Sequence, residues 1–396
     1  MFGTSRRQVL AMALAMPFLA DPVPRGGKCR ELTIKGRSVK ICPPPTDEHA
    51  LVLDETVFID GVPLRAMVMP GGFSSALNQH VIHPTLLSMV TEAVHLLRGA
   101  RLVNPRPLAP VELAHPDVAG RAGGRNAGRL RKHAAALTAA ERTTLVNAFL
   151  ELKRSGAYDF FVDVHRRAFD NHGWNAHMHA GFLAWHRAYL LLFENQLGTA
   201  LPYWDWSTQQ RPDATPFTPD FLGGNGRPGD TQVMDGPFAY RTGQWPITVS
   251  EDDRNFLRRE FGAQADRPSG PSVVDRALAM DVYDRPPYDS SAEGFRNLVE
   301  GWPGGPQMHN RAHVWVGGNM LGASSPNDPA FFLNHCFVDK LWADWQARHP
   351  SAAHFLPAEL LDVPLEPFRS ESGWTITPRE LLDHRKWYTY GGAPAL

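Results

Sequence analysis

Six histidines in two separated groups are the residues of this sequence best suited to metal chemistry. Imidazole nitrogens bind copper, zinc and iron, and three neutral imidazoles leave positions on a metal open to external ligands. Each group lies beside an aromatic-rich stretch, so the pattern predicts two metal ions held together on facing helices. The first group is His165, His177 and His186, and the second is His309, His313 and His335.

The second group argues against one class of metal enzyme. His309 and His313 stand at positions i and i+4, which places both side chains on one face of a helix. Zinc proteases with this spacing have a glutamate directly after the first histidine as the general base. That position is Asn310 here. The pattern therefore disfavours a protease, and spacing alone leaves the identity of the metal open.

Apolar residues at helical spacing predict the elements that carry the other histidines. Three such stretches are 158–169, 184–197 and 328–348, which carry His165, His186 and His335 in that order. Upstream of them, Thr138 and Glu141 form a capping-box pattern that predicts the start of another helix, ending near Arg154. Helices are therefore expected to dominate the second part of the chain.

The chain before residue 105 has a different pattern. Asp60 and Gly61 lie between two apolar runs, 57–59 and 64–69, as in a β-hairpin. Pro84 then precedes apolar residues at helical spacing over 86–97. These elements predict a small α+β domain.

Two features near the N-terminus indicate export. Arg6 and Arg7 precede a short apolar run and resemble a twin-arginine (Tat) signal. The run is too short to span a membrane. Cys29 and Cys42 flank an alternating stretch, where a disulfide would suit an exported protein; two free thiols are the alternative.

Bulk composition limits the classes of partner. The 396 residues suffice for two domains, and a net charge of -1 with 43% hydrophobic residues is typical of an ordinary soluble protein. The sequence has no basic patch with interleaved aromatic residues, so no nucleic-acid partner is expected. We expect no membrane partner either, and a monomer.

Motifs around both histidine groups resemble the signatures of tyrosinases, which are type 3 copper proteins. They are HAGFLAWHRAYLLLFE and LPYWDWS near the first group, and HNRAHVWVGG and SPNDPAFFLNHCFVDKLWADWQ around the second. The resemblance runs from about residue 129 to the end of the chain. It implies a mainly α fold in which a four-helix bundle holds a dinuclear copper site.

The resemblance also implies ligands, cofactors and a reaction. Two copper ions would be the cofactors, with copper A on the first histidine group and copper B on the second. His179 could compete with His177, but the spacing to His186 favours His177. Dioxygen would be the co-substrate for hydroxylating a small phenol and oxidising o-diphenols to o-quinones, as in melanin or other phenolic pigment formation. Glu300 and Asn310 match the residues that hold a water in relatives.

The N-terminal part is similar to the small caddie proteins that bacterial tyrosinases use for copper loading and export. The similar segments are VFIDGVPL and LLRGARL. Caddie proteins insert a tyrosine into the copper site, and His80 stands near the matching place. His80 could therefore plug the site or transfer copper, with His83, Met67 and Met69 as neighbours. A Met-x-Met pair that simply belongs to the core is the alternative.

Two further residues would surround copper B. Phe331 resembles the ring that packs over this copper, although a core aromatic residue is an equally simple explanation. Asn334 stands where bacterial relatives have a second histidine, and such neighbours tune metal ligands.

Three functions follow from the resemblance. The first is a secreted oxidase of monophenols and diphenols. The second is an o-aminophenol or catechol oxidase with little monophenol hydroxylation, which Asn334 leaves open. The third is a haemocyanin-like oxygen carrier, which the short length disfavours. The domains expected are a Tat-type signal (1–25), a caddie-like α+β domain (26–104), a Pro/Gly-rich linker (105–128) and the catalytic domain (129–396).

Overall fold

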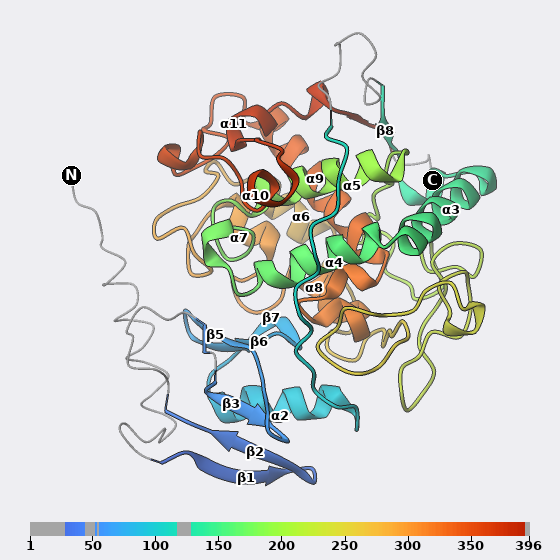
Figure 1. The fold of residues 1–396 in the computed structure, drawn as a ribbon. Coiled ribbons are helices and arrows are strands. Elements are labelled where there is room, and N and C mark those ends of the chain that lie inside the picture. The colour runs from blue at the N-terminus through green and yellow to red at the C-terminus, as the bar shows by residue number, and fades with distance from the viewer. Residues whose placement is uncertain (1–27, 44–51, 54, 117–127, 393–396) are drawn as a thin grey trace.

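The computed structural model describes residues 28–43, 52–53, 55–116 and 128–392 (Figure 1). The export signal expected at 1–25 lies outside them. The strands are β1 (Arg30–Ile34), β2 (Arg37–Ile41), β3 (Val57–Ile59), β4 (Val62–Pro63), β5 (Ala66–Met69), β6 (Gly72–Ser75), β7 (Asn78–His83), β8 (Leu130–Arg131) and β9 (Thr389–Tyr390). The helices are α2 (Leu86–Leu97), α3 (Ala139–Ser155), α4 (Ala157–Ala168), α5 (Phe182–Leu197), α6 (Pro271–Leu278), α7 (Phe295–Glu300), α8 (Met308–Val316), α9 (Ala330–Arg348), α10 (Phe368–Ser372) and α11 (Pro378–Leu381).

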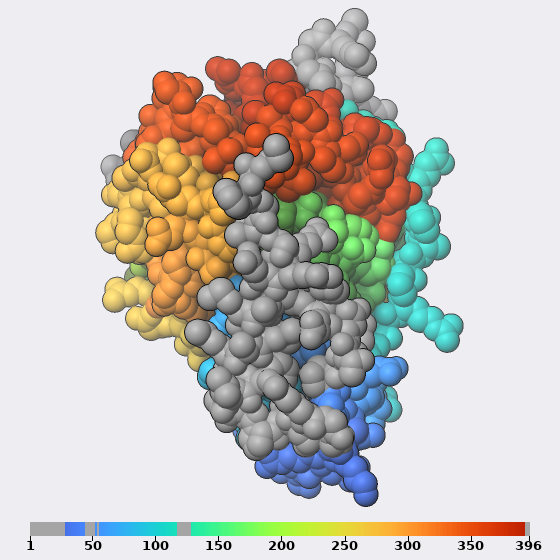
Figure 2. All heavy atoms as spheres, turned by 90° about the vertical axis from the view of Figure 1, so that its left-hand side faces the viewer, coloured from blue at the N-terminus to red at the C-terminus, as the bar shows by residue number. Residues whose placement is uncertain are grey.

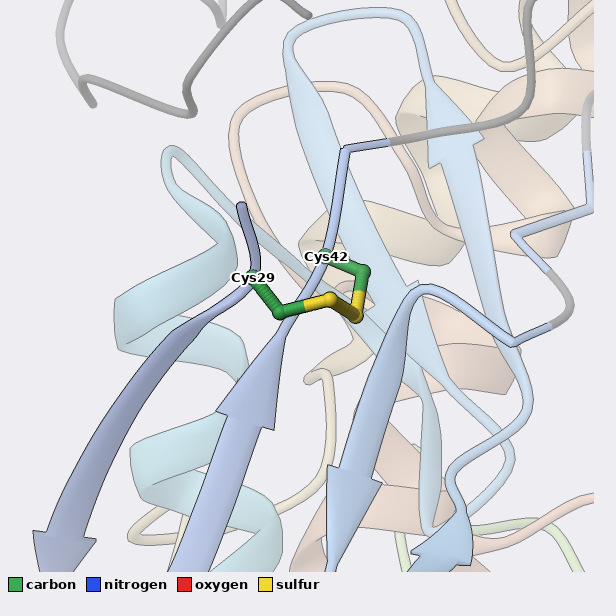
Figure 3. Close-up of a disulfide and its surroundings, with 2 residues drawn as sticks. All are labelled: Cys29 and Cys42. Atoms are coloured by element: carbon green, nitrogen blue, oxygen red, sulfur yellow. A yellow bond between two sulfur atoms is a disulfide. The ribbon is translucent and has the colours of Figure 1, made fainter. Parts of the chain in front are cut away.

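Two small antiparallel sheets form the first part of the chain. Strands β1 to β4 make one sheet in chain order, and β5 to β7 make the other. A disulfide between Cys29 and Cys42 joins the outer ends of β1 and β2, as predicted (Figure 3). The predicted turn between β3 and β4 is present, with positive φ at both Asp60 and Gly61. The strand after this turn is only Val62–Pro63, and most of the second apolar run of the predicted hairpin, 64–69, instead forms β5, which pairs with β6 in the other sheet.

Helix α2 packs on these sheets, and its bounds are those predicted from the sequence. Thr85 begins the helix through a capping box with Ser88. The apolar face of α2, which includes Met89, Val90 and Ala93, is buried against the strands in one hydrophobic cluster. The N-terminal part therefore has a core of its own.

The remaining chain is mainly helical. The capping box of Thr138 begins α3, and Gly156, with a φ of 81°, ends α3 and lets α4 begin immediately. Helix α9 packs against both α5 and α8. Aromatic and aliphatic side chains from these helices form the largest hydrophobic core. The predicted helices are thus confirmed, with no end shifted by more than two residues.

The extended segment 105–116 lies along the helical body, where Figure 1 shows it crossing α4 and α5. The amide of Leu108 donates to Asp163 on α4 at 3.0 Å, and the carbonyl of Ala114 accepts from Asn195 on α5 at 2.7 Å. This segment therefore fastens the chain to the body before residue 117.

The N-terminal part is docked on the helical body by several kinds of contact. The amide of Ala323 donates to the carbonyl of Ala76 at 2.8 Å. Three arginines of the N-terminal part pair with acids of the body, in the pairs Arg65–Asp170, Arg98–Glu260 and Arg101–Asp253. In Figure 2 the blue portion of the N-terminal part lies at the opposite end of the molecule from the red C-terminal residues. Within the described residues, no helix is long and apolar enough to cross a membrane.

Candidate metal centre

The structure brings the six histidines together as two triads. In each triad, one ring nitrogen from each histidine lies within 4.8 Å of those of the other two. The Nε2 atoms of His165 and His177 are 3.1 Å apart, and those of His309 and His335 are 3.0 Å apart. Nitrogens this close suit a shared metal ion, because metal–nitrogen bonds of about 2.0–2.1 Å bring neighbouring ligands to such separations.

Helices position five of the six rings. In triad A (His165, His177 and His186), α4 carries His165 and α5 carries His186. His177 lies on the loop between these helices, where its neighbour Met178 has a φ of 56°. In triad B (His309, His313 and His335), α8 carries the first two rings and α9 carries the third.

Backbone carbonyls orient four of the rings. In triad A, Nδ1 of His165 donates to the carbonyl of Ala323 (2.8 Å) and Nδ1 of His186 donates to that of Phe182 (2.9 Å). In triad B, Nδ1 of His309 donates to the carbonyl of Glu300 (3.2 Å) and Nδ1 of His313 donates to that of Met320 (2.7 Å). This leaves Nε2 as the nitrogen with a free lone pair, which is the usual arrangement of metal-bound histidine. The buried Nε2 atoms of His186 and His313 have no hydrogen-bond partner among the described residues.

Burial keeps these imidazoles neutral. It lowers the pKa of His165 to about 4 and the pKa of His309 to about 3. The pKa values of the other four rings are also lowered by burial, with further lowering from neighbouring histidines. Neutral imidazole is the form that binds metals, and buried nitrogens without partners gain most from a metal. The residues therefore fit a pair of metal ions.

The two triads face each other. The rings of His186 and His335 are stacked with centroids 4.2 Å apart. Phe331 lies between the triads, 4.8 Å from the ring of His165 and 4.2 Å from that of His335. Two metals held by these rings would therefore be neighbours.

Glu300 and Asn310 lie beside the triads. The carboxylate of Glu300 is buried and accepts hydrogen bonds from the amide of Met178 and from Arg296. Burial raises the pKa of Glu300, and the charge of Arg296 opposes this rise. The side-chain oxygen of Asn310 lies 2.9 Å from Nδ1 of His309.

His80, from the N-terminal part, covers triad B. Its ring stacks on His313 with centroids 3.9 Å apart and meets His309 edge-on at 5.5 Å. Its Nδ1 donates to the side-chain oxygen of Asn310 at 3.1 Å. The ring is only 2% exposed, and its Nε2 has no hydrogen-bond partner in the described chain.

The three neighbours proposed for His80 are placed differently. His83 is not brought to the triads; its Nε2 lies 2.8 Å from a carboxylate oxygen of Glu92 on α2. Met67 and Met69 are buried in a cluster that joins the two parts of the chain, together with Phe169, Trp302 and Ala323, and Met178 packs against it. The two methionines thus lie in an apolar contact next to the loop of His177.

Asn334, which the sequence analysis placed near copper B, accepts a hydrogen bond from the indole of Trp206 at 2.9 Å.

Several other residues around the site were not singled out by sequence analysis. Arg296 was missed because an arginine on a short helix carries no motif. Met178 and Trp302 were missed too, although each stands within two residues of a predicted site residue.

Comparison with known proteins gives a consistent result. The common central domain of tyrosinase matches residues 155–348. A tyrosinase from Streptomyces antibioticus is 47% identical over 271 residues, which cover 66% of this chain and 98% of the relative. Grixazone synthase from Streptomyces griseus is 40% identical over 307 residues, with the same coverage of 66% and 98%.

Solved structures share the fold. A latent aurone synthase, a polyphenol oxidase, matches with a TM-score of 0.51 and 17% identity over 75% of this chain and 64% of its own. A polyphenol oxidase from Thermothelomyces thermophila matches with a TM-score of 0.50 and 22% identity over 67% and 89%. Together with the two triads, these findings show that the chain belongs to the tyrosinase family and is a copper-dependent phenol oxidase.

Proposed function

We propose that this oxidase hydroxylates small monophenols and oxidises o-diphenols to o-quinones at two copper ions, and that its own N-terminal part controls access to them. Triad A would hold one copper and triad B the other, in a bundle formed by α4, α5, α8 and α9. Residues 26–104 would act as a caddie-like domain. We propose further that a Tat signal exports both parts together as a secreted monomer.

The observation that carries the copper assignment is the orientation of the rings. Four of them are fixed by carbonyl contacts at Nδ1, so that Nε2 is left for a metal. Imidazole ligands with open positions suit copper. Copper bound there would supply the binding and reduction of dioxygen, and the chain must supply the rest.

The chain would bind the phenol ring and help to remove the proton of its hydroxyl group. A phenol with a pKa near ~10 must lose its proton before its oxygen becomes a good ligand. Glu300 and Asn310 are the polar side chains beside the triads that can hold a water for this step. The face of the His313 ring that His80 covers would, once uncovered, be a surface on which a phenol can stack.

The position of His80 supports the control of access. Its ring stacks on His313, and its Nδ1 donates a hydrogen bond to the side-chain oxygen of Asn310. While His80 is in place, a phenol can neither stack on His313 nor bind to that oxygen. The surrounding contact between the two parts includes a buried methionine-containing cluster and backbone hydrogen bonds. Such contacts hold the covering segment more firmly than exposed ion pairs alone would.

The test combines metal analysis with rate measurements on the full chain. Purified protein loaded with copper should contain two copper ions per chain and should oxidise tyrosine, a catechol and o-aminophenol. His80→Ala should raise the rates at least about tenfold, equivalent to about 1.4 kcal/mol of lost covering contact. His83→Ala is the matched control, because His83 lies on the same strand but pairs with Glu92.

Each outcome has a distinct meaning. Fewer than two coppers per chain after full loading would contradict the metal assignment. Equal rates for wild type and His80→Ala would contradict the covering role. Oxidation of the catechol and o-aminophenol without tyrosine turnover would replace the proposed monophenol activity by an aminophenol or catechol oxidase.

A further inference from the structure

Arg296 on α7 is a fully buried arginine that contacts two carboxylates. Its Nη1 donates to Oε2 of Glu300 at 2.9 Å, one helical turn later. Its Nε and Nη2 donate to Oδ2 of Asp284 at 2.9 and 2.7 Å. Nη2 also donates to the carbonyl of Asp289 at 2.9 Å. The guanidinium is therefore fixed on several sides, and Glu300 is fixed with it.

Glu300 makes a hydrogen bond toward each of the two triads. Its other carboxylate oxygen accepts from the amide of Met178, directly after His177 of triad A. Its own carbonyl accepts from Nδ1 of His309 in triad B at 3.2 Å. A shift of the carboxylate therefore changes the support of the His177 loop and the place where a water beside Asn310 would be held.

The segment before Asp284 holds the same loop from its other end. Tyr283 is buried, and its hydroxyl donates to the carbonyl of Ala180 at 2.7 Å. Residues 283 and 284 thus contact both the His177 loop and Arg296. This arrangement indicates that Arg296 orients the side chain of Glu300, in addition to stabilising α7, which has only six residues.

We infer that Arg296, held by Asp284, is a positioning residue that fixes the carboxylate of Glu300 for the hydroxylation of monophenols. The inference rests on the proposed role of Glu300. Diphenol oxidation requires no new C–O bond, so it should depend less on this position. The two reactions therefore report separately on the contact.

The test uses Arg296→Lys, which keeps the charge but loses the planar set of N–H donors that reaches Asp284 and Glu300 together. The monophenol kcat should fall about 10- to 100-fold, the range for loss of an outer-shell partner, while the diphenol kcat changes by less than about threefold. Copper should remain at two per chain. Hydrogen exchange of the peptide around Met178 should become faster, because its amide partner has moved.

Arg259→Lys is the matched control. Arg259 is also fully buried and makes a bidentate pair with Asp328, at 2.7 and 2.8 Å, but has no contact with Glu300. It should lower the melting temperature comparably and leave both the ratio of the two activities and the exchange of the Met178 peptide unchanged. An equal change in both variants would overturn the inference.

Glu300→Gln separates this inference from the proposed function. If Glu300→Gln leaves monophenol turnover intact, the proposed role of Glu300 is wrong. If Glu300→Gln slows monophenol turnover and Arg296→Lys does not, only the positioning role of Arg296 is wrong. If both slow it, their effects in the double variant should be less than additive, because both act through one carboxylate.

Discussion

The two histidine triads differ in what holds them. In triad B all three rings stand on helices, with His309 and His313 one turn apart on α8. In triad A the third ring, His177, stands on a loop and is only partly buried. Helices therefore carry every ring of triad B, whereas triad A depends also on the contacts of one loop.

The triads also differ in what covers them. His80 lies on His313 and His309 of triad B, and strand β7 packs against α8. No ring of the N-terminal part stacks on triad A within the described residues: its loop is held by Glu300 on the amide of Met178 and by Tyr283 on the carbonyl of Ala180, with Met67 and Met69 packed beside Met178. We conclude that opening of the N-terminal part should affect triad B first.

The largest effect is expected from removing one ligand of each triad. His177→Ala and His335→Ala should each reduce copper from two ions to one per chain. Both should lower phenol oxidation by more than about 100-fold, since even outer-shell losses cost up to that much. Metal analysis and steady-state rates check this. Loss of both coppers from either variant would show that the triads do not bind independently.

Phe331 tests whether the triads share one wall. Phe331→Ala should destabilise the protein by about 3–5 kcal/mol and weaken copper binding at both triads, because the ring contacts both. Phe149→Ala is the control: Phe149 on α3 is equally buried, and its ring packs on Phe193 at 5.8 Å and on Phe238 at 6.1 Å. Denaturant titration and copper affinity measure the two effects. Weaker copper binding in the control would contradict the shared wall.

Sequence patterns predicted the regular elements well. The period of apolar residues located α2, α4, α5 and α9, because burial of one helix face dictates that period. Cysteine spacing around a hairpin predicted the disulfide, and imidazole spacing on a helix predicted the proximity of His309 and His313.

Long-range contacts could not be predicted in this way. The bonds of Arg296 to Asp284 and of Tyr283 to Ala180 join loops whose approach no local period encodes. The separation of His83 from the triads is similar, since its pairing with Glu92 depends on how α2 packs on β7. The approach of His80 to the copper site was suggested by the resemblance to caddie proteins rather than by spacing, and its contact with Asn310 was not predicted.

The disulfide tests the cover of triad B. Replacing Cys29 and Cys42 by serine should cost about 3 kcal/mol, the value for closing a loop of this length. This loss of stability should be confined to the N-terminal part. Hydrogen exchange should then become faster in α8, under His80, more than in α5. An equal increase in both helices would show that the N-terminal part does not cover triad B selectively.

The smallest effect is expected from Tyr283→Phe, which tests the support of triad A. The change removes one hydroxyl and leaves the buried carbonyl of Ala180 unpaired, at a cost of about 1–3 kcal/mol. Copper affinity should fall a few-fold at triad A and stay constant at triad B, because no helix that carries triad B depends on this bond. Tyr158→Phe is the control, since its buried hydroxyl also donates to a carbonyl, that of Pro326, away from both triads. If Tyr158→Phe weakened copper A as much, general loosening of the core would account for the effect, and the loop of His177 would need no support of its own.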